Sequence, residues 1–248
     1  MLAWGLVLLA LASPAPERPR LESRLRVPPR LTVGDRFEMT VVVTSPRRSL
    51  VTGPLTDSAG VFALGQLVRK TTPRAGLDVS TYRLSLATGS MSAANDYMEM
   101  TQLALQAGFP NEARQVVDKG FAAGVLGAGK EAERHKRLRD LVAKKIEEDK
   151  QVLPERLAEA QEAKDGTPLV NIGMNLVFNG DKARGLQMMQ KGIARDNLKR
   201  PDDAKLHLAI AQLSAGDNGK AVATLREVKG NDGTADLARL WSLFARRK

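Results

Sequence analysis

The spacing of apolar residues divides this chain of 248 residues into two parts. In the C-terminal two-thirds, apolar side chains recur every three or four positions, which is the spacing of helices with one buried face. In the N-terminal third, apolar and polar residues alternate in short runs that proline and glycine separate, which is typical of strands. The sequence therefore predicts a multidomain chain, with a short all-β part followed by an all-α part. The expected boundaries are 1–15 for a signal segment, 16–87 for the β part, 88–92 for a linker and 93–248 for the helical part.

The helical part contains a repeated sequence. The segment ARQVVDKGFAAGVL (Ala113–Leu126) aligns without gaps with GLQMMQKGIARDNL (Gly185–Leu198) at an offset of 72 residues. The alignment places Lys119 opposite Lys191, and each lysine precedes a glycine. Because the match includes both apolar and polar positions, the two segments are expected to have the same structure.

A second alignment gives the length of the repeating unit. IGMNLVFNGDKARGLQM at 172–188 aligns with LAIAQLSAGDNGKAVAT at 208–224, at an offset of 36 residues. Two helices joined by a short turn have about this length. Since 72 is twice 36, a further helix pair is expected between the first two copies. Its helices are predicted at about Lys130–Lys150 and Val152–Lys164.

Small residues mark the turns and the close contacts of the predicted hairpins. Gly108, Gly180 and Gly216 follow the first helix of a pair, where a left-handed backbone commonly ends a helix. The last stretch, Thr234–Arg247, has one apolar face and is expected to cover the exposed end of the array. Small residues at four helical positions would let paired helices approach closely: Gly173, Gly185, Ala209 and Ala221.

The N-terminal part is expected to form a partial immunoglobulin-like sandwich. Alternation is clearest in RFEMTVVVT, which places Phe37, Met39, Val41 and Val43 on one face. Four or five strands can be counted, whereas such a sandwich has about seven, so the sheet is expected to be incomplete. The clearest runs are 21–27, 37–44, 60–68 and 78–87.

The helical units resemble tetratricopeptide repeats, which are helix hairpins with a usual period of 34 residues. The resemblance rests on a glycine at the turn and a small residue five positions later, as at Gly180 and Gly185 and again at Gly216 and Ala221. The period here is longer by two residues, and the closing proline is missing. The resemblance implies a solenoid of stacked α-hairpins whose first helices line a groove for a peptide or protein partner.

The beginning of the chain is similar to that of exported proteins. The apolar run Leu2–Ala12 is too short to span a membrane and fits a signal segment, although no lysine or arginine precedes it. Val33-Gly34-Asp35 and the strand Phe37–Thr44 resemble the first domain of the BatD family of bacterial envelope proteins. The expected location is therefore periplasmic or otherwise exported, with the cytoplasm as the alternative.

Composition and charge limit the possible chemistry. The chain has no cysteine, so disulfides and thiolate metal sites are excluded. Its net charge is +10, yet acidic residues are interleaved with the basic ones and only 4% of residues are aromatic. A nucleic-acid partner is therefore not expected. Residues 1–90 use almost only arginine as the basic residue, whereas lysine and arginine are balanced afterwards, which suggests a linker or a junction between parts of different origin.

The sequence GVLGAGK, from Gly124 to Lys130, has the glycine and lysine spacing of a phosphate-binding loop. Such a loop needs a strand before it and a Ser or Thr after the lysine, but residue 131 is glutamate and helical spacing precedes the loop. A hinge between helices is therefore expected. His135 and His207 lie in different units without neighbouring ligands, so no metal, cofactor or catalytic residue is predicted.

The sequence predicts a non-catalytic scaffold for protein–protein interaction. By the resemblance, its groove positions are mostly apolar, which favours a hydrophobic helix or strand as ligand, from a partner, from this chain or from a second copy. The same side chains could equally fill the core. A structural or self-assembly accessory protein that forms homo-oligomers is the alternative, and a basic nucleic-acid-binding protein is less favoured. The predicted groove residues are Met98, Gln102, Leu105, Val170, Met174, Val177, Leu206, Ile210 and Leu213.

Overall fold

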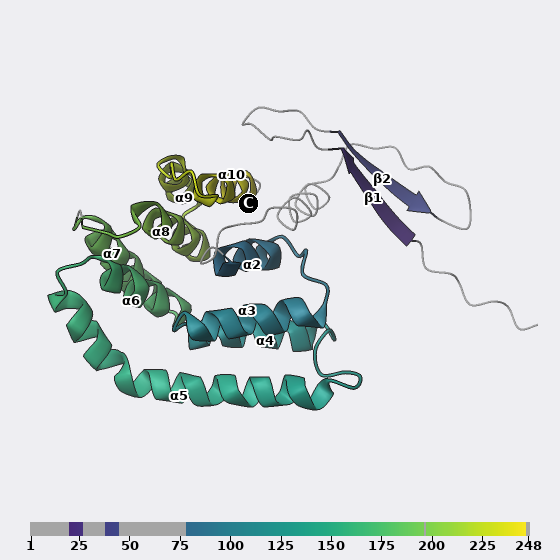
Figure 1. Ribbon diagram of the computed structural model, residues 1–248, viewed down its shortest axis with the longest axis horizontal. Coiled ribbons are helices and arrows are strands. Elements are labelled where there is room, and N and C mark those ends of the chain that lie inside the picture. Colours follow the sequence, from purple (N-terminus) through teal and green to yellow (C-terminus); the bar gives the residue numbers. More distant parts are fainter. Residues whose placement is uncertain (1–19, 27–37, 45–77, 196, 247–248) are drawn as a thin grey trace, which may run out of the picture. The chain divides into compact units, whose positions relative to one another are not determined.

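A computed structural model describes residues 20–26, 38–44, 78–195 and 197–246 (Figure 1). The chain divides into two compact units, Met1–Pro54 and Leu55–Lys248, and each is described by itself. The predicted signal segment lies outside the described residues, as does the predicted strand at 60–68. Among the described residues, no helix combines the length and the apolar character that crossing a membrane requires.

The described part of the first unit is a pair of antiparallel strands. Strands β1 (Arg20–Arg26) and β2 (Glu38–Thr44) pair so that Leu21 lies opposite Val43 and Leu25 opposite Met39. The pairing matches the alternation that predicted both strands.

The predicted immunoglobulin-like sandwich is wrong. The run Asp78–Ala87, expected as a strand, is helix α2. Outside β1 and β2, the regular structure of the described residues is helical. The period-2 alternation failed here because α2 is contacted on several sides, so its sequence has no single apolar face.

The second unit contains three helix hairpins that confirm the predicted turns. Gly108, Gly180 and Gly216 follow the first helix of each hairpin with φ of 80°, 97° and 92°, in the left-handed region that glycine adopts without strain. Their spacing of 72 and 36 residues is the spacing of the sequence repeat. The hairpins are α3 (Ala94–Gln106) with α4 (Pro110–Ala122), α6 (Thr167–Phe178) with α7 (Lys182–Ile193), and α8 (Pro201–Ala215) with α9 (Asn218–Arg226).

The helix pair predicted between the first two hairpins is instead one long helix, α5 (Ala132–Glu162). It continues through Pro154, which removes one backbone N–H donor but does not end the helix. Figure 1 shows that α5 bends in its C-terminal part, the usual effect of an internal proline. One face of α5 repeats at helical spacing and is buried, through His135, Leu138, Val142 and Ile146.

The α6–α7 hairpin is held by direct contact of its backbones. A Cβ atom on Gly173 would lie 2.6 Å from the carbonyl oxygen of Gly185, and one on Gly185 would lie 2.5 Å from that of Gly173. Only glycine allows this approach, as the sequence predicted for these positions. In the next hairpin, Ala209 and Ala221 are fully buried.

The last helix, α10 (Thr234–Ala245), covers the end of the array. Its predicted apolar face is buried and packs on α8 and α9, through Leu237, Leu240, Trp241 and Phe244. The Trp241 and Phe244 rings meet edge to face with centroids 5.8 Å apart. Among the described residues, the long helix α5 and the short helix α2 are thus the two helices outside the hairpin pattern and the terminal helix.

Candidate functional site: a helix seated against the array

Helix α2 lies against the array rather than within it. Figure 1 shows α2 between the α3–α4 hairpin and the α8–α10 end of the unit. Its side chains are buried on more than one face: Ser80, Arg83, Leu84 and Ser85 are each at most 6% exposed. A ten-residue helix is marginal by itself in water, so these contacts with the array supply its stability.

The central contact of α2 is a buried ion pair. Arg83 Nε and Nη2 donate to the two carboxylate oxygens of Glu112 on α4, at 2.6 and 2.7 Å. Both side chains are 4% exposed. The paired geometry uses the planar fork of the guanidinium, which a lysine could not reproduce.

Two aromatic rings enclose the same guanidinium. Arg83 Cζ lies 5.4 Å from the centroid of Phe109 and 5.3 Å from that of Phe178. Phe109 is the N-cap residue directly before α4 and Phe178 ends α6, and the centroids of the two rings are 5.7 Å apart. Arg83 therefore lies where the first and second hairpins meet, and both ring faces attract its charge.

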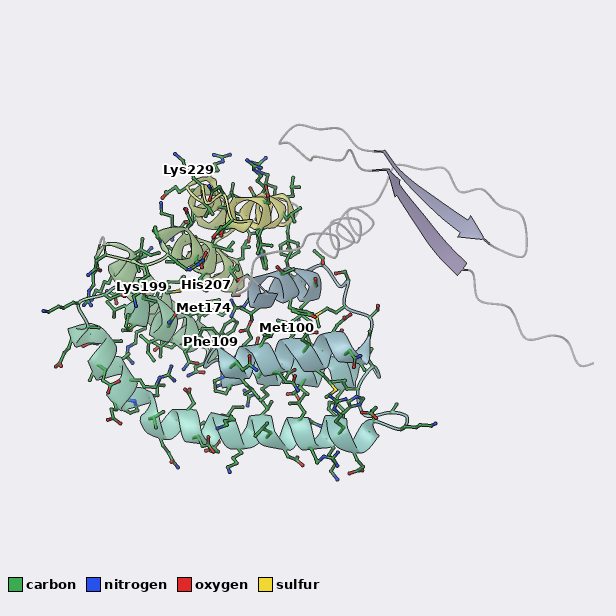
Figure 2. All side chains as sticks on the ribbon, in the orientation of Figure 1. Met100, Phe109, Met174, Lys199, His207 and Lys229 are labelled. Atoms are coloured by element: carbon green, nitrogen blue, oxygen red, sulfur yellow. The ribbon has the colours of Figure 1, made fainter. Side chains whose placement is uncertain are left out.

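His207 on α8 belongs to the same neighbourhood. The loss of water around its ring, and secondly the Arg83 guanidinium, lower the pKa of His207 from 6.5 to about 3. Figure 2 labels His207 together with Phe109, Met100 and Met174, and these last three are buried while His207 is half-buried. His207 is consequently neutral at physiological pH, and Arg83 and Glu112 carry the buried charge.

A cavity of about 160 Å³ adjoins α2. It is lined by Arg83 and Leu86 of α2, by residues of α3 and α4, and by residues of α6, α8 and α10. Its inner wall is mostly apolar, and the exposed residues Gln115, Lys119 and Ser214 line it as well. The inner lining includes Met100, Val116, Phe178, Ile210, Leu213, Trp241 and Phe244.

Two residues that line this cavity each have a buried N–H group without an acceptor among the described residues. The groups are Nη1 of Arg83 and Nε1 of Trp241. Arg83 is 5% exposed and Trp241 is 3% exposed. An unpaired buried N–H costs about 1–3 kcal/mol, so an acceptor that reached either group would be favoured.

The predicted linker at 88–92 secures the end of α2. The Thr88 hydroxyl donates to the carbonyl of Leu84 at 2.8 Å, and the Ser90 hydroxyl donates to that of Ser85 at 3.2 Å. Thr88, Ser90 and Met91 are buried. The segment is therefore packed against the array.

The nine predicted groove residues occupy three kinds of position. Gln102 is exposed, and Leu105 is partly buried. Ile210 and Leu213 line the cavity beside α2. The other predicted residues pack inside the array, at most 5% exposed: Met98, Val170, Met174, Val177 and Leu206.

Sequence reasoning named Ile210 and Leu213, which line the cavity, but missed the residues that hold α2. Arg83 was one member of an apparent strand, and Glu112, Phe109 and Phe178 belong to no motif. Trp241 was recognised only as part of an apolar face. Lys119 carried a weaker signal, since the repeat aligns it with Lys191.

The glycine-rich loop has a structural role. It follows helix α4 rather than a strand, and Gly124 has a φ of 67°. The backbone N–H of Gly127 donates to Nδ1 of buried His135 at 3.1 Å, which fixes the loop to α5. Within the described ranges, no group of three His, Asp or Glu side chains could hold a metal ion.

No protein-family model, curated protein or solved structure matches the chain. The residues of the site provide an apolar surface for a helix, one buried acceptor for a basic side chain of that helix, and a cavity lined by two residues that each have an unpaired buried donor.

Proposed function

We propose that the chain is a non-catalytic protein-interaction scaffold, a tetratricopeptide-like array that binds a short helix bearing an arginine. In this proposal α2 is the occupant that the chain itself supplies. The observation that carries it is the seating of Arg83, paired with Glu112 and enclosed by Phe109 and Phe178. A partner helix would present an arginine to the same three residues.

The form of the α2 contact supports recognition of a separate helix. One buried side chain makes the ion pair and both ring contacts, which is the pattern of an anchor residue in an interface. Residues 88–93 connect α2 to α3, so α2 competes with any partner at an effective concentration of about millimolar. A free helix would then bind only when α2 leaves its place.

The proposal is tested with a labelled peptide of sequence DVSTYRLSLAT, taken from 78–88, and a matched peptide with alanine in place of the arginine. The receptor is the full chain carrying Arg83→Ala and Leu84→Ala, which removes the anchor and a fully buried leucine of α2. Fluorescence anisotropy is expected to show the arginine peptide binding at least about tenfold more tightly than the alanine peptide. The unsubstituted chain is expected to bind both weakly, because its own α2 competes.

Two results would contradict the proposal. Equal binding of the two peptides would show that Arg83 is not an anchor. Loss of the helical circular-dichroism signal in the doubly substituted chain would show that α2 is an obligatory part of the core. A second copy of the chain acting as the partner would appear as a concentration-dependent dimer in sedimentation, with exchange of α2 between copies.

A further inference from the structure

The cavity beside α2 is a candidate site for a small molecule. Two of the residues that line it, Arg83 and Trp241, have a buried N–H group without an acceptor among the described residues. Both groups are donors, and neither can accept a hydrogen bond. A ligand that satisfies them must therefore bring an acceptor.

The size and lining of the cavity limit the rest of the ligand. A dry cavity of about 150 Å³ holds a benzene molecule, so the cavity of about 160 Å³ suits a body of similar size. Met100, Val116 and Phe244 supply apolar walls. The body of the ligand is accordingly a short hydrocarbon chain or a single ring.

The charges around the cavity favour an anion. The ionised lining residues are Arg83, Lys119 and Glu112, two cations and one carboxylate, which leaves a net charge of +1. Glu112 is committed to Arg83 through both of its oxygens. Lys119 is exposed near the end of α4, where it can attract an anion without losing its own hydration.

We propose that this cavity binds a small free monocarboxylate, whose oxygens accept hydrogen bonds from Arg83 Nη1 and Trp241 Nε1. A cation would be repelled by Lys119 and would leave both donors unpaired. A neutral hydrocarbon would fill the space but would leave the same two groups without an acceptor. The proposal requires only that α2 be seated, as it is in the structure, and does not depend on exchange of α2 with a partner.

The test uses benzoate as the probe and benzyl alcohol as a neutral molecule of similar shape. Isothermal titration calorimetry on the full chain is expected to show saturable benzoate binding at millimolar concentration or below, and weaker binding of benzyl alcohol. Trp241→Phe removes the indole donor but keeps an aromatic side chain, and it is expected to weaken benzoate binding about tenfold. Circular dichroism checks that this variant remains folded.

The sequence repeat supplies a matched control for the charge. Lys119 and Lys191 lie at equivalent positions of α4 and α7, and both are exposed near the helix end, but only Lys119 lines the cavity. Lys119→Gln is expected to weaken benzoate binding about two- to fivefold, less so at high salt. Lys191→Gln is expected to leave the affinity unchanged.

Several outcomes would overturn the proposal. One is the absence of saturable binding of benzoate, and another is equal binding of benzoate and benzyl alcohol. Equal weakening of benzoate binding by Lys119→Gln and Lys191→Gln would show that only the overall charge of the chain affects this binding. Tighter binding of a blocked glutamate-containing tripeptide than of benzoate would assign the carboxylate to a protein partner instead of a free acid.

Discussion

At the scale of single residues, the Arg83–Glu112 pair decides whether α2 is seated. Removing a buried charge from water costs several kcal/mol, and that cost is offset only when the partner and the hydrogen bonds are well placed. Here both carboxylate oxygens accept from Arg83, and two rings cover the guanidinium. The site formed by Glu112 and the two rings therefore discriminates strongly against a helix that lacks an arginine at this position.

His207 gives the chain a dependence on pH that can be measured. Its pKa is about 3 in the folded chain and 6.5 in the unfolded chain, since burial and Arg83 oppose a charged ring. Below pH 6.5 the unfolded chain binds a proton that the folded chain does not bind until pH approaches 3, so stability falls over that window. The free energy of unfolding is expected to drop by about 2 kcal/mol between pH 7 and pH 5, measured by urea denaturation.

The control for this prediction is His207→Gln, a side chain that does not titrate. The variant is expected to lose most of the pH dependence between pH 7 and pH 5. The carboxyls of Glu148 and Asp165 contribute little there: hydrogen bonds from Lys145 and Thr167 lower their pKa values, but the ordinary pKa values of 4.5 and 3.8 already lie below pH 5, so their effect on stability comes mainly at lower pH. An unchanged slope in the variant would assign the effect to another group.

At the scale of elements, the α6–α7 hairpin depends on its glycines. A methyl group at Gly173 would lie 2.6 Å from a backbone carbonyl of α7, so the helices would have to separate. Gly173→Ala is expected to lower the free energy of unfolding by about 1–3 kcal/mol. Gly219→Ala in α9 is the control: no atom lies within 4 Å of its added carbon, and the change is expected to be neutral or to stabilise by up to about 1 kcal/mol. Equal losses in urea denaturation of the two variants would contradict this account.

The repeat in the sequence was enough to predict the hairpins and their turns. Gly108, Gly180 and Gly216 have the left-handed backbone that their positions indicated, because the turn geometry depends on local residues. The buried face of α5 was also predictable, since a single apolar stripe with helical spacing faces the array. These features can be predicted because they depend on residues that are close together in the sequence.

The site and the helix that forms it could not be predicted in the same way. Alternating residues in Asp78–Ala87 indicated a strand, but α2 buries polar Ser80, Arg83 and Ser85 as well as Leu84, which hides any helical period. The helix pair expected at 130–164 is wrong because it was inferred from the repeat offset alone, whereas the local sequence forms one helix, α5, that continues through Pro154. The cavity joins residues from six helices, and no local pattern relates them.

At the scale of the whole helical unit, the array is continuous in spite of α5. Direct contacts join the first hairpin to α6: Asn111 donates to Asn179 at 2.6 Å, and Gln115 donates to the carbonyl of Phe178 at 3.4 Å. On α5, buried Asp149 accepts from Asn175 of α6 at 3.0 Å. The long helix therefore supports a junction that the hairpins already make.

Helix α2 adds contacts between parts of the array that are distant in sequence. A simple solenoid has contacts only between neighbouring repeats, and its ends can unfold separately. Here Arg83 touches the first hairpin and α6, and the cavity wall extends from α2 to α8 and α10. The seated helix thus connects the first hairpin with the last helices.

The unit is therefore expected to unfold as one cooperative structure while α2 is seated. In native-state hydrogen exchange, the slowest amides of α3–α4 and of α8–α10 are expected to report the same free energy of opening. Arg83→Ala with Leu84→Ala is expected to separate the two groups by at least about 1 kcal/mol, because the ends then lose the helix that connects them. Leu243→Ala, on an exposed part of α10, is the control. It is expected to leave both groups of amides with the same free energy of opening. If both groups of amides still reported the same free energy of opening in the doubly substituted chain, the array without α2 would be the source of the cooperativity.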